Sequence, residues 1–514
     1  MSLPVVPAKL KSSFLRQQGG FAINELLFHV PLDYCQPSGP LITVTVRIVR
    51  GYSAAAAADG NDSVLRAGCG LDLDLDGADN GQPLAVYLVG GPGADNPPTA
   101  RPAITRFYLN KGFHVLYMDY RGTGSSTPLR ADLPPLRGRS PATQAALLRH
   151  FRQDNIVRDL EAVRYALAGS AAATATAGAG ATVGRAPASA PTWTLVGQSY
   201  GGWIALTYLS FYPVALAQVF LTGGLPPVGQ PAATVYRQTY RRVIAACDAF
   251  YARYPDDVQR VRDIVRFIVM VGHNAIPLPM GDSASSSSSG SDDSNTGGGG
   301  VLSAERFLGL GRMLGATDGA RQLHAEIRRC WTELRTQGGF SDATLRRLDA
   351  GGCPFAERPL YAVLHEPIYA EGAGPTAWAA LRIGRTLPEY WWLRTPDALT
   401  RACQRGDARF CGGTAAAAAG GGRRCRSNPA ADAAAAAASW SPLYDTAQLR
   451  ANTVPVAALS YEHDLFVDAG LSRATATLLG GPVQHVVRAD LAHTAIKDRP
   501  EVVLPLTWGL LHPQ

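Results

Sequence analysis

Residues 193–202 read Trp-Thr-Leu-Val-Gly-Gln-Ser-Tyr-Gly-Gly, and this stretch decides the fold. Its first four residues favour a strand, and a helical pattern follows at 203–212, directly before Pro213. A strand, a tight turn that carries a serine and a helix together lift the serine hydroxyl off the edge of a sheet. Small residues around Ser199 keep such a turn free of clashes. The pattern therefore predicts that Ser199 is a catalytic nucleophile.

Strand-like segments occur on both sides of this turn. Residues 84–89 and 113–118 are continuous apolar runs, which are typical of strands buried on both faces. Residues 144–168 carry apolar side chains at helical spacing. Further strands are expected at 26–30, 42–49, 218–222, 454–460 and 483–488. Strands that alternate with helices predict an α/β fold, with a mostly parallel sheet covered on both faces.

The pattern changes between residues 225 and 440, where helical segments replace strands. Helices are expected at 235–254, 256–271, 304–314 and 319–337. Strand-like sequence resumes afterwards, which argues against a separate C-terminal domain. We therefore interpret 225–440 as a helical cap inserted into a core that residues 1–224 and 441–514 form together.

Three low-complexity tracts interrupt the chain, at 169–190, 281–300 and 412–438. They are rich in Ala, Gly, Ser or Thr and cannot bury enough apolar area to offset the entropy lost on ordering. We predict that they form disordered surface loops. The alanine run at 54–58 is interpreted as a loop insertion for the same reason.

The composition argues against a nucleic-acid or membrane protein. The chain has 514 residues, a net charge of +7 and 48 basic residues, of which only four are lysines. The arginines are scattered and form no basic stripe, so no nucleic-acid partner is expected. The first 18 residues lack the apolar core of a signal peptide, and no run approaches the roughly 20 apolar residues of a membrane span.

The cysteines point to a reducing compartment. There are eight, and they form neither a dense disulfide pattern nor a CxxC metal pair. We therefore expect free thiols, which are typical of proteins in a reducing compartment. A soluble, cytoplasmic protein is therefore predicted. The basic N-terminus leaves open whether an organelle contains it.

A serine nucleophile needs a base and an acid that orients it, and in this fold type both follow the serine in the chain. His493 comes just after the last expected strand and before a C-terminal helix, so it is the candidate base. Asp464 directly follows the strand at 454–460 and is the candidate acid. Glu462 and Asp468 are nearby competitors for that role.

Two glycine-rich turns follow buried strands. Gly90-Gly91-Pro92-Gly93 ends the strand at 84–89, and glycines permit the close approach that an oxyanion site needs. We assign the two donors to the N–H groups of Gly91 and Tyr200. The second turn contains Asp119 and Arg121, and we predict that an ion pair between them braces the loops in a structural role.

Six motifs occur in a fixed order. They read Val-Pro-Leu-Asp-Tyr at 30–34, Gly-Gly-Pro-Gly at 90–93, Asp-Tyr-Arg-Gly-Thr-Gly at 119–124, Gly-Gln-Ser-Tyr-Gly-Gly at 197–202, His-Glu-Pro-Ile-Tyr at 365–369 and Tyr-Glu-His-Asp-Leu-Phe-Val at 461–467. Together they resemble the prolyl aminopeptidase (proline iminopeptidase) family of α/β-hydrolases over nearly the whole chain outside the low-complexity tracts. The resemblance implies an α/β-hydrolase fold with an eight-stranded sheet and a cap.

The resemblance also implies an activity: release of N-terminal proline from short peptides, without metal or cofactor. An acyl-enzyme would form on Ser199, with His493 as base and then acid and with Asp464 orienting it. Carboxylates in the cap would bind the free α-ammonium of the substrate. By its position in the motif, Glu366 is the candidate for one of them.

The sequence departs from the family at three places. Val89 stands where many members carry His or Gln, and Tyr120 replaces a common Gln. Where close relatives carry Phe-Thr-Gly-Glu, this chain has Phe-Cys-Gly-Gly at 410–413, so Gly413 replaces an acid. Two alternatives therefore stay open: an esterase or amidase with the same triad, and an inert binding protein that retains the fold.

Overall fold

The computed structural model describes most of the chain. It covers residues 5–18, 20–51, 82–129, 136, 138–173, 190–279, 301–351, 359–394, 398, 401–402 and 439–513. The loop insertion at 54–58, the tracts at 281–300 and 412–438, and the motif at 410–413 lie outside these residues. So does 174–189 of the first tract, whereas 169–173 continue a helix instead of starting a loop.

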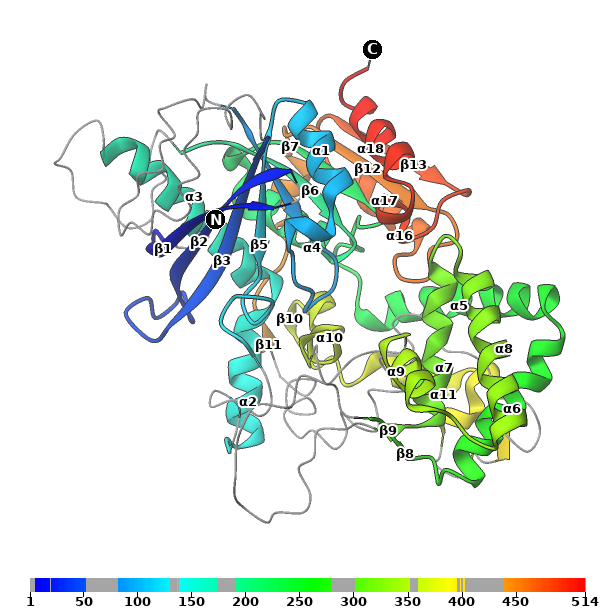
Figure 1. Cartoon of the computed structure of the whole chain (residues 1–514). Coiled ribbons are helices and arrows are strands. Elements are labelled where there is room, and N and C mark those ends of the chain that lie inside the picture. Colours follow the sequence, from blue (N-terminus) through cyan, green and yellow to red (C-terminus); the bar gives the residue numbers. More distant parts are fainter. Residues whose placement is uncertain are drawn as a thin grey trace.

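A large sheet forms the centre of the protein (Figure 1). Its order is β1-β2-β3-β5-β4-β6-β7-β12-β13, and the strands from β5 to β13 in this order are all parallel. The strands are β1 (Lys9–Gln18), β2 (Phe21–Pro31), β3 (Leu41–Gly51), β4 (Leu84–Leu88), β5 (His114–Asp119), β6 (Trp193–Gln198), β7 (Leu216–Thr222), β12 (Val456–Tyr461) and β13 (Val483–Arg488). The α/β-hydrolase fold expected from the sequence is confirmed.

Within the described residues the sheet has nine strands, one more than expected. The additional strand is β1, which pairs antiparallel with β2 at the edge of the sheet. Most of its side chains are exposed, so it lacks the apolar alternation that marks a half-buried strand. The other eight strands coincide with the eight segments expected from the sequence.

Helices cover both faces of the sheet. The helices α1 (Pro102–Asn110) and α18 (Pro500–Gly509) pack on each other and against the sheet. The second group consists of α3 (Gln153–Ala173), α4 (Tyr200–Phe211), α15 (Thr446–Arg450) and α16 (Ala469–Leu478). The single helix expected at 144–168 is wrong in one respect: α2 (Pro141–Leu148) ends in a 3-10 turn, and extended backbone at Arg152 separates it from α3.

The residues between β7 and β12 are mainly helical, and most of these helices lie beside the sheet (Figure 1). They are α5 (Ala232–Arg253), α6 (Asp256–Met270), α7 (Ala304–Leu308), η6 (Gly309–Gly315), α8 (Gly319–Gln337), α9 (Asp342–Gly351), α10 (Pro359–Leu364), η7 (Pro367–Tyr369), α11 (Ala379–Thr386) and η8 (Pro388–Leu393). The helix expected at 304–314 is thus a short α-helix followed by a 3-10 segment.

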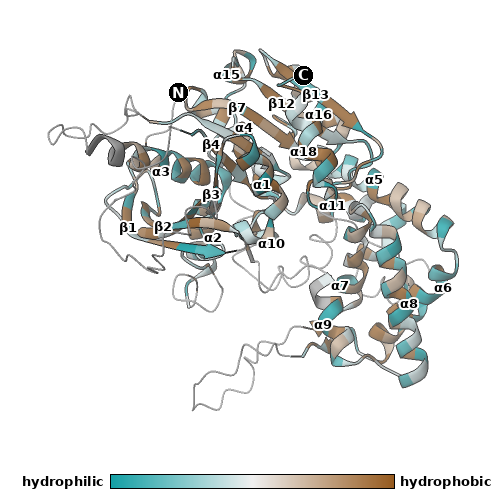
Figure 2. Cartoon of the chain, turned by 45° about the horizontal axis from the view of Figure 1, so that its top comes forward, coloured by the Kyte–Doolittle hydropathy of each residue, from teal (hydrophilic) through white to brown (hydrophobic). Residues whose placement is uncertain are grey.

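Apolar side chains gather in separate clusters in the two regions. The strands in the middle of the sheet are mostly brown in Figure 2, whereas α6 and α8 carry hydrophilic residues on their outer surfaces. The helices around α5, α6 and α8 share their own buried cluster. The short helix α10 instead packs with residues of the segment 129–151. None of the helices in the described ranges is both long and apolar enough to cross a membrane.

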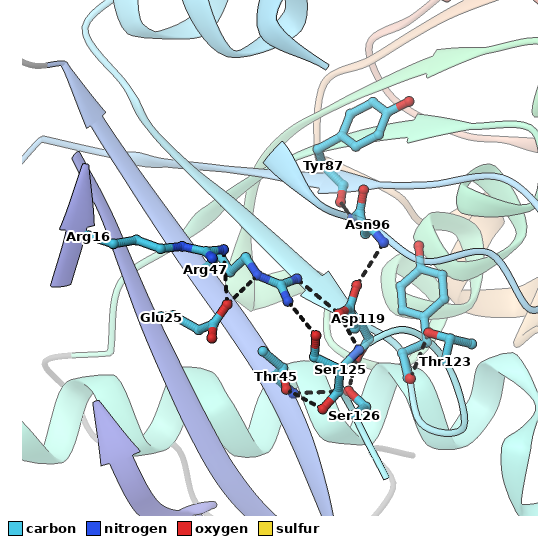
Figure 3. Close-up of polar contacts among 11 residues, drawn as sticks. Arg16, Glu25, Thr45, Arg47, Tyr87, Asn96, Asp119, Thr123, Ser125 and Ser126 are labelled. Carbon is cyan, nitrogen blue, oxygen red and sulfur yellow. Dashed lines mark hydrogen bonds and ion pairs between the residues drawn. The ribbon is translucent and has the colours of Figure 1, made fainter. Parts of the chain in front are cut away.

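The expected ion pair between Asp119 and Arg121 is wrong, because each residue has a different partner. The buried Asp119 carboxylate accepts hydrogen bonds from Arg47 Nη1 at 2.9 Å, from the Ser125 N–H at 2.8 Å and from the Asn96 N–H at 2.7 Å (Figure 3). Arg47 also donates to Glu25 at 2.6 Å. Asp119 thus fixes both its own turn and the loop that follows β4.

Arg121 forms a buried pair with Asp159 of α3. Its Nε and Nη2 donate to the two carboxylate oxygens at 2.7 and 2.6 Å, and both side chains are fully buried. Its remaining N–H groups donate to the carbonyls of Pro31, Leu32 and His150. The pair therefore ties the end of β2 to α3, with the bracing role that the sequence analysis gave to the turn.

Candidate active site

Ser199 lies in the turn between β6 and α4. Its φ is 53° and its ψ is −124°, so a non-glycine residue occupies a sparsely populated region of backbone space. Such strain costs about 1–3 kcal/mol and persists only where the surroundings enforce it. Here the Ser199 N–H donates to the Thr222 carbonyl of β7, and the Ser199 carbonyl accepts from the Gly202 N–H at 2.7 Å.

The glycines after the serine permit α4 to approach the sheet closely. A Cβ atom at Gly201 would lie 2.0 Å from the carbonyl oxygen of Leu88 at the end of β4. A Cβ atom at Gly202 would lie 1.7 Å from the carbonyl oxygen of Gly224. A residue with a side chain could therefore replace neither glycine unless the backbone moved. Gly201 and Gly202 are thus explained by close contact with the end of β4 and with the residues after β7, and a Cβ atom at Gly197 would lie 2.8 Å from the Gly201 carbonyl oxygen.

His493 lies in the loop between β13 and α17 (Ala495–Asp498), at the same edge of the sheet. Its Nε2 is 2.9 Å from Ser199 Oγ. The ring is buried and packs against Phe466, with 4.6 Å between the ring centroids. Its backbone N–H donates to the Gly315 carbonyl in the helical region at 3.1 Å. The structure therefore brings together the serine and the histidine expected from the sequence.

Asp464 follows β12 and lies behind the histidine. Its Oδ2 is 2.7 Å from His493 Nδ1, while its Oδ1 accepts from the N–H groups of Phe466 and Val467 at 2.8 and 3.1 Å. The side chain is fully buried. An ionised carboxylate only accepts hydrogen bonds, so this contact leaves the proton on Nδ1 and the lone pair of Nε2 facing Ser199.

The two competing acids have other partners. Glu462 pairs with Arg473 and Arg242. Asp468 accepts from the Leu471 N–H as the N-cap of α16 and also pairs with Arg242. Among the three acids, Asp464 is therefore the one in contact with His493.

The turn after β4 lies directly against the serine. A Cβ atom at Gly90 would be 2.9 Å from Ser199 Cβ, so a side chain there would collide with the candidate nucleophile. Gly91 has a φ of 150°, a conformation that L side chains rarely adopt. Tyr200 is the first residue of α4, and the N–H groups of a first helical turn have no partner within the helix. The structure thus brings both candidate oxyanion residues to Ser199.

A cavity of about 990 Å³ opens above these residues. Ser199, Gly91, Tyr200 and His493 all line it. Its walls also include the aromatic and apolar side chains Trp203, Tyr361, Ile368, Tyr369 and Phe466. Pockets of small-molecule enzymes typically measure about 300–1,000 Å³, so this one has room for a short peptide. Within the described ranges, no group of three or more His, Cys, Asp or Glu side chains is arranged to hold a metal ion.

Glu366 lies beside this cavity and not in the described part of its lining, whereas its neighbour His365 lines it. The Glu366 side chain is buried, and its Oε1 accepts from the Ala380 N–H in α11 at 2.9 Å. Burial raises the pKa of Glu366 to about 7, although the N–H groups of Ala380 and Ala379 oppose the shift. Burial also lowers the pKa of His365 to about 4, so this imidazole is neutral at pH 7.

A hydrogen-bonded bridge that was not predicted from the sequence connects the Ser199 turn with the helical region. Gln153 accepts from the Tyr200 hydroxyl at 3.3 Å and donates to the Ile368 carbonyl at 3.1 Å. The buried Arg152 donates to the carbonyls of Ala370 and Ser441 at 2.6 and 2.8 Å. A buried Arg-Gln pair at the start of a helix is the only signal the sequence carries for this bridge.

Comparison with known proteins agrees with this geometry. The chain is 33% identical over 404 residues to a proline iminopeptidase from Aeromonas sobria, covering 78% of this chain and 81% of that protein. The chain belongs to the proline iminopeptidase family. It is also 28% identical over 507 residues to the proline iminopeptidase aneH of Aspergillus aculeatus, covering 98% of this chain and 97% of that protein. As a member of this family, the chain is a hydrolase.

No model of a protein family matches the sequence. The solved structure of a proline iminopeptidase from Mycobacterium smegmatis aligns with 94% of this chain and 97% of its own length, at 13% identity and a TM-score of 0.38.

Proposed function

We propose that this chain is a serine aminopeptidase that releases N-terminal proline from short peptides. The observation that carries the proposal is the row of contacts from Asp464 through His493 to Ser199 at the base of a peptide-sized cavity. Family membership supports the substrate, because both relatives are named proline iminopeptidases. Residues 225–440 are proposed to form the cap over this site.

In the proposed reaction, His493 Nε2 takes the Ser199 hydroxyl proton as Oγ bonds to the carbonyl carbon of the N-terminal residue. The N–H groups of Gly91 and Tyr200 stabilise the oxygen that becomes negative. The C–N bond then breaks, and His493 gives its proton to the departing amine. Water attacks the acyl-enzyme with His493 again as base, which releases proline and restores Ser199. The Asp464 carboxylate orients the imidazole and stabilises its charged form.

Glu366 is proposed to receive the free amine of the substrate. Its Oε2 is buried and receives no hydrogen bond of good geometry from a described residue, although the Ala379 N–H and the Thr376 hydroxyl lie close enough to lower the pKa of the carboxyl group. A buried acceptor without a partner is unfavourable, and an ammonium group would satisfy it. Because His365 lines the cavity and Glu366 is the next residue, a small rearrangement of η7 and α11 would bring the carboxylate to a substrate.

The test is hydrolysis of prolyl-4-nitroanilide, N-acetyl-prolyl-4-nitroanilide and 4-nitrophenyl acetate by the purified protein. We expect cleavage of the free-amine prolyl substrate and little cleavage of the acetylated one. A protein that hydrolyses the ester but neither prolyl compound would contradict the aminopeptidase. It would instead favour the alternative, an esterase or amidase with the same triad, for which the position of Glu366 outside the described lining is the supporting observation.

Substitution of Glu366 tests the ammonium site directly. Glu366→Gln is expected to raise KM for prolyl-4-nitroanilide by about tenfold, since a charge-assisted hydrogen bond contributes about 1.5–3 kcal/mol, and to leave 4-nitrophenyl acetate hydrolysis within about twofold. Gln keeps the size of the side chain, so packing is preserved. Equal effects on both substrates would remove Glu366 from ammonium recognition.

The pKa of Glu366 adds a pH dependence. Only the ionised carboxylate attracts an ammonium, and burial raises its pKa to about 7. The ratio of kcat/KM for prolyl-4-nitroanilide to that for 4-nitrophenyl acetate should therefore fall as pH drops through about 7. Any effect of pH on the shared catalytic residues acts on both substrates and cancels in the ratio. A ratio that stays constant between pH 6 and 8 would contradict the assignment.

A further inference from the structure

Among the charged side chains in the described lining of the Ser199 cavity, cations outnumber carboxylates. Four cations, Arg101, Arg312, Arg346 and Lys497, and a single carboxylate, Asp95, are among the described residues that line it. Nothing in the proposed mechanism uses this charge. It is also of the wrong sign to hold the ammonium group of an aminopeptidase substrate, so it needs a separate explanation.

The cations come from both sides of the cavity. Arg101 precedes α1 and Lys497 lies in α17, both in the core. Arg312 lies in η6 and Arg346 in α9, two helical segments that pack against each other. Four separate segments of the chain thus each place a cation on the same cavity, whereas the other arginines are scattered along the sequence.

Exposure places Arg346 and Lys497 toward the opening of the cavity, whereas the guanidinium of Arg101 lies deeper, 5.5 Å from the centroid of the buried Tyr87 ring. Arg346 and Lys497 are exposed, and Arg101 and Arg312 are half-buried. By contrast, the apolar and aromatic lining next to Ser199 includes the buried side chains of Trp203 and Ile368. A molecule bound in this cavity therefore meets apolar surface at the serine and positive charge toward solvent.

We propose that these cations bind the C-terminal carboxylate of a short peptide substrate. The inference rests on the proposed aminopeptidase function: the N-terminal residue is acylated at Ser199, so the leaving part of the peptide extends toward the opening. In a dipeptide or tripeptide with neutral side chains, the C-terminal carboxylate is the only anion. Arginine forks match carboxylate geometry, and a cavity of one sign of charge concentrates the opposite ion.

The proposal makes the enzyme selective for length. Each further residue moves the carboxylate outward by up to about 3.3–3.6 Å. Beyond a few residues, the carboxylate leaves the cavity and its attraction to the cations is screened by solvent and salt. Short peptides with a free C-terminus are then the favoured substrates.

The experiment compares the free acid Pro-Gly-Gly with its amide, Pro-Gly-Gly-NH2. We expect kcat/KM for the acid to exceed that for the amide by about three- to tenfold, which corresponds to one or two partly exposed ion pairs. The difference should shrink when NaCl is raised from 0.05 to about 0.5 M. In Arg312→Gln/Arg346→Gln the acid-to-amide ratio should approach one. Arg328→Gln, an exposed arginine of α8 outside the cavity lining, is the matched control and should keep the wild-type ratio.

The outcomes separate this proposal from the proposed function. Equal kcat/KM values for acid and amide in the wild-type protein would overturn the carboxylate site while leaving the aminopeptidase intact, and this comparison needs no variant. If neither prolyl peptide nor prolyl-4-nitroanilide is cleaved, the proposed function itself fails. A preference for Pro-Glu-Gly-NH2 over Pro-Gly-Gly-NH2, without an acid-to-amide difference, would assign the cations to an acidic side chain and overturn the C-terminal assignment.

Discussion

Replacement of Ser199 by alanine is expected to lower kcat for prolyl-4-nitroanilide by about 10⁴-fold or more, because no other group at the site forms the acyl-enzyme. His493 and Asp464 stay in place in such a variant, yet without the hydroxyl they have no proton to move. The measurement is the initial rate at an enzyme concentration high enough to detect a 10⁴-fold lower rate, followed by the absorbance of the released 4-nitroaniline.

The fold of Ser199→Ala is expected to be intact. Alanine occupies a positive φ no more easily than serine, so the strain at this turn is unchanged and the melting temperature should stay within about 2 °C. Ser210→Ala, in the same helix α4, is the matched control: Ser210 Oγ donates only to the Leu206 carbonyl, and its loss should keep activity within about twofold. Wild-type turnover by Ser199→Ala would refute the nucleophile assignment.

The sequence predicted the candidate catalytic residues because local pattern and chain order constrain them. Ser199, Asp464 and His493 each follow a parallel strand, and the carboxyl ends of parallel strands meet at one edge of the sheet. Correct prediction of the strands was therefore sufficient to predict that these three residues lie close together. The same reasoning located the glycine turn at Gly90 and Gly91.

Partner choice among buried charges could not be predicted in this way. Asp119 and Arg121 are two residues apart, but Asp119 ends β5 and Arg121 lies in the turn after it, so the alternation of a strand does not fix the direction of the Arg121 side chain. Their partners, Arg47 and Asp159, are 72 and 38 residues away in sequence. The choice depends on how β3 and α3 pack, which no local pattern contains.

Tyr120 and Val89, two of the residues at which this chain differs from the family pattern, are in contact. The Tyr120 hydroxyl donates to the Val89 carbonyl at 3.1 Å, and both residues are buried. Val89 precedes the glycines of the oxyanion turn, so the tyrosine adds a hydrogen bond that holds the start of this turn. The sequence marked both positions as unusual but carried no sign that they are neighbours.

Removal of one partner from the buried pair Arg121–Asp159 should be strongly destabilising. Asp159→Leu would leave the Arg121 charge buried without its carboxylate, which costs about 3–5 kcal/mol. The same substitution would remove the acceptor of the Tyr34 hydroxyl. Burial raises the pKa of Tyr34 well above its usual value, so the hydroxyl stays a neutral donor that needs an acceptor. The expected result is a clear fall in the midpoint of urea denaturation, followed by tryptophan fluorescence.

The double variant Arg121→Met/Asp159→Leu separates the unpaired charge from the loss of packing. It removes both charges and should recover most of the lost stability. Recovery should remain incomplete by about 1–3 kcal/mol, because the carbonyls of Pro31, Leu32 and His150 lose their donor. The matched control is Asp318→Asn, in an exposed pair with Arg321, which should change stability by less than about 1 kcal/mol. If Asp159→Leu were no less stable than this control, the Arg121 charge would have to reach solvent in the variant. The contact between the end of β2 and α3 would then contribute little to the free energy of unfolding.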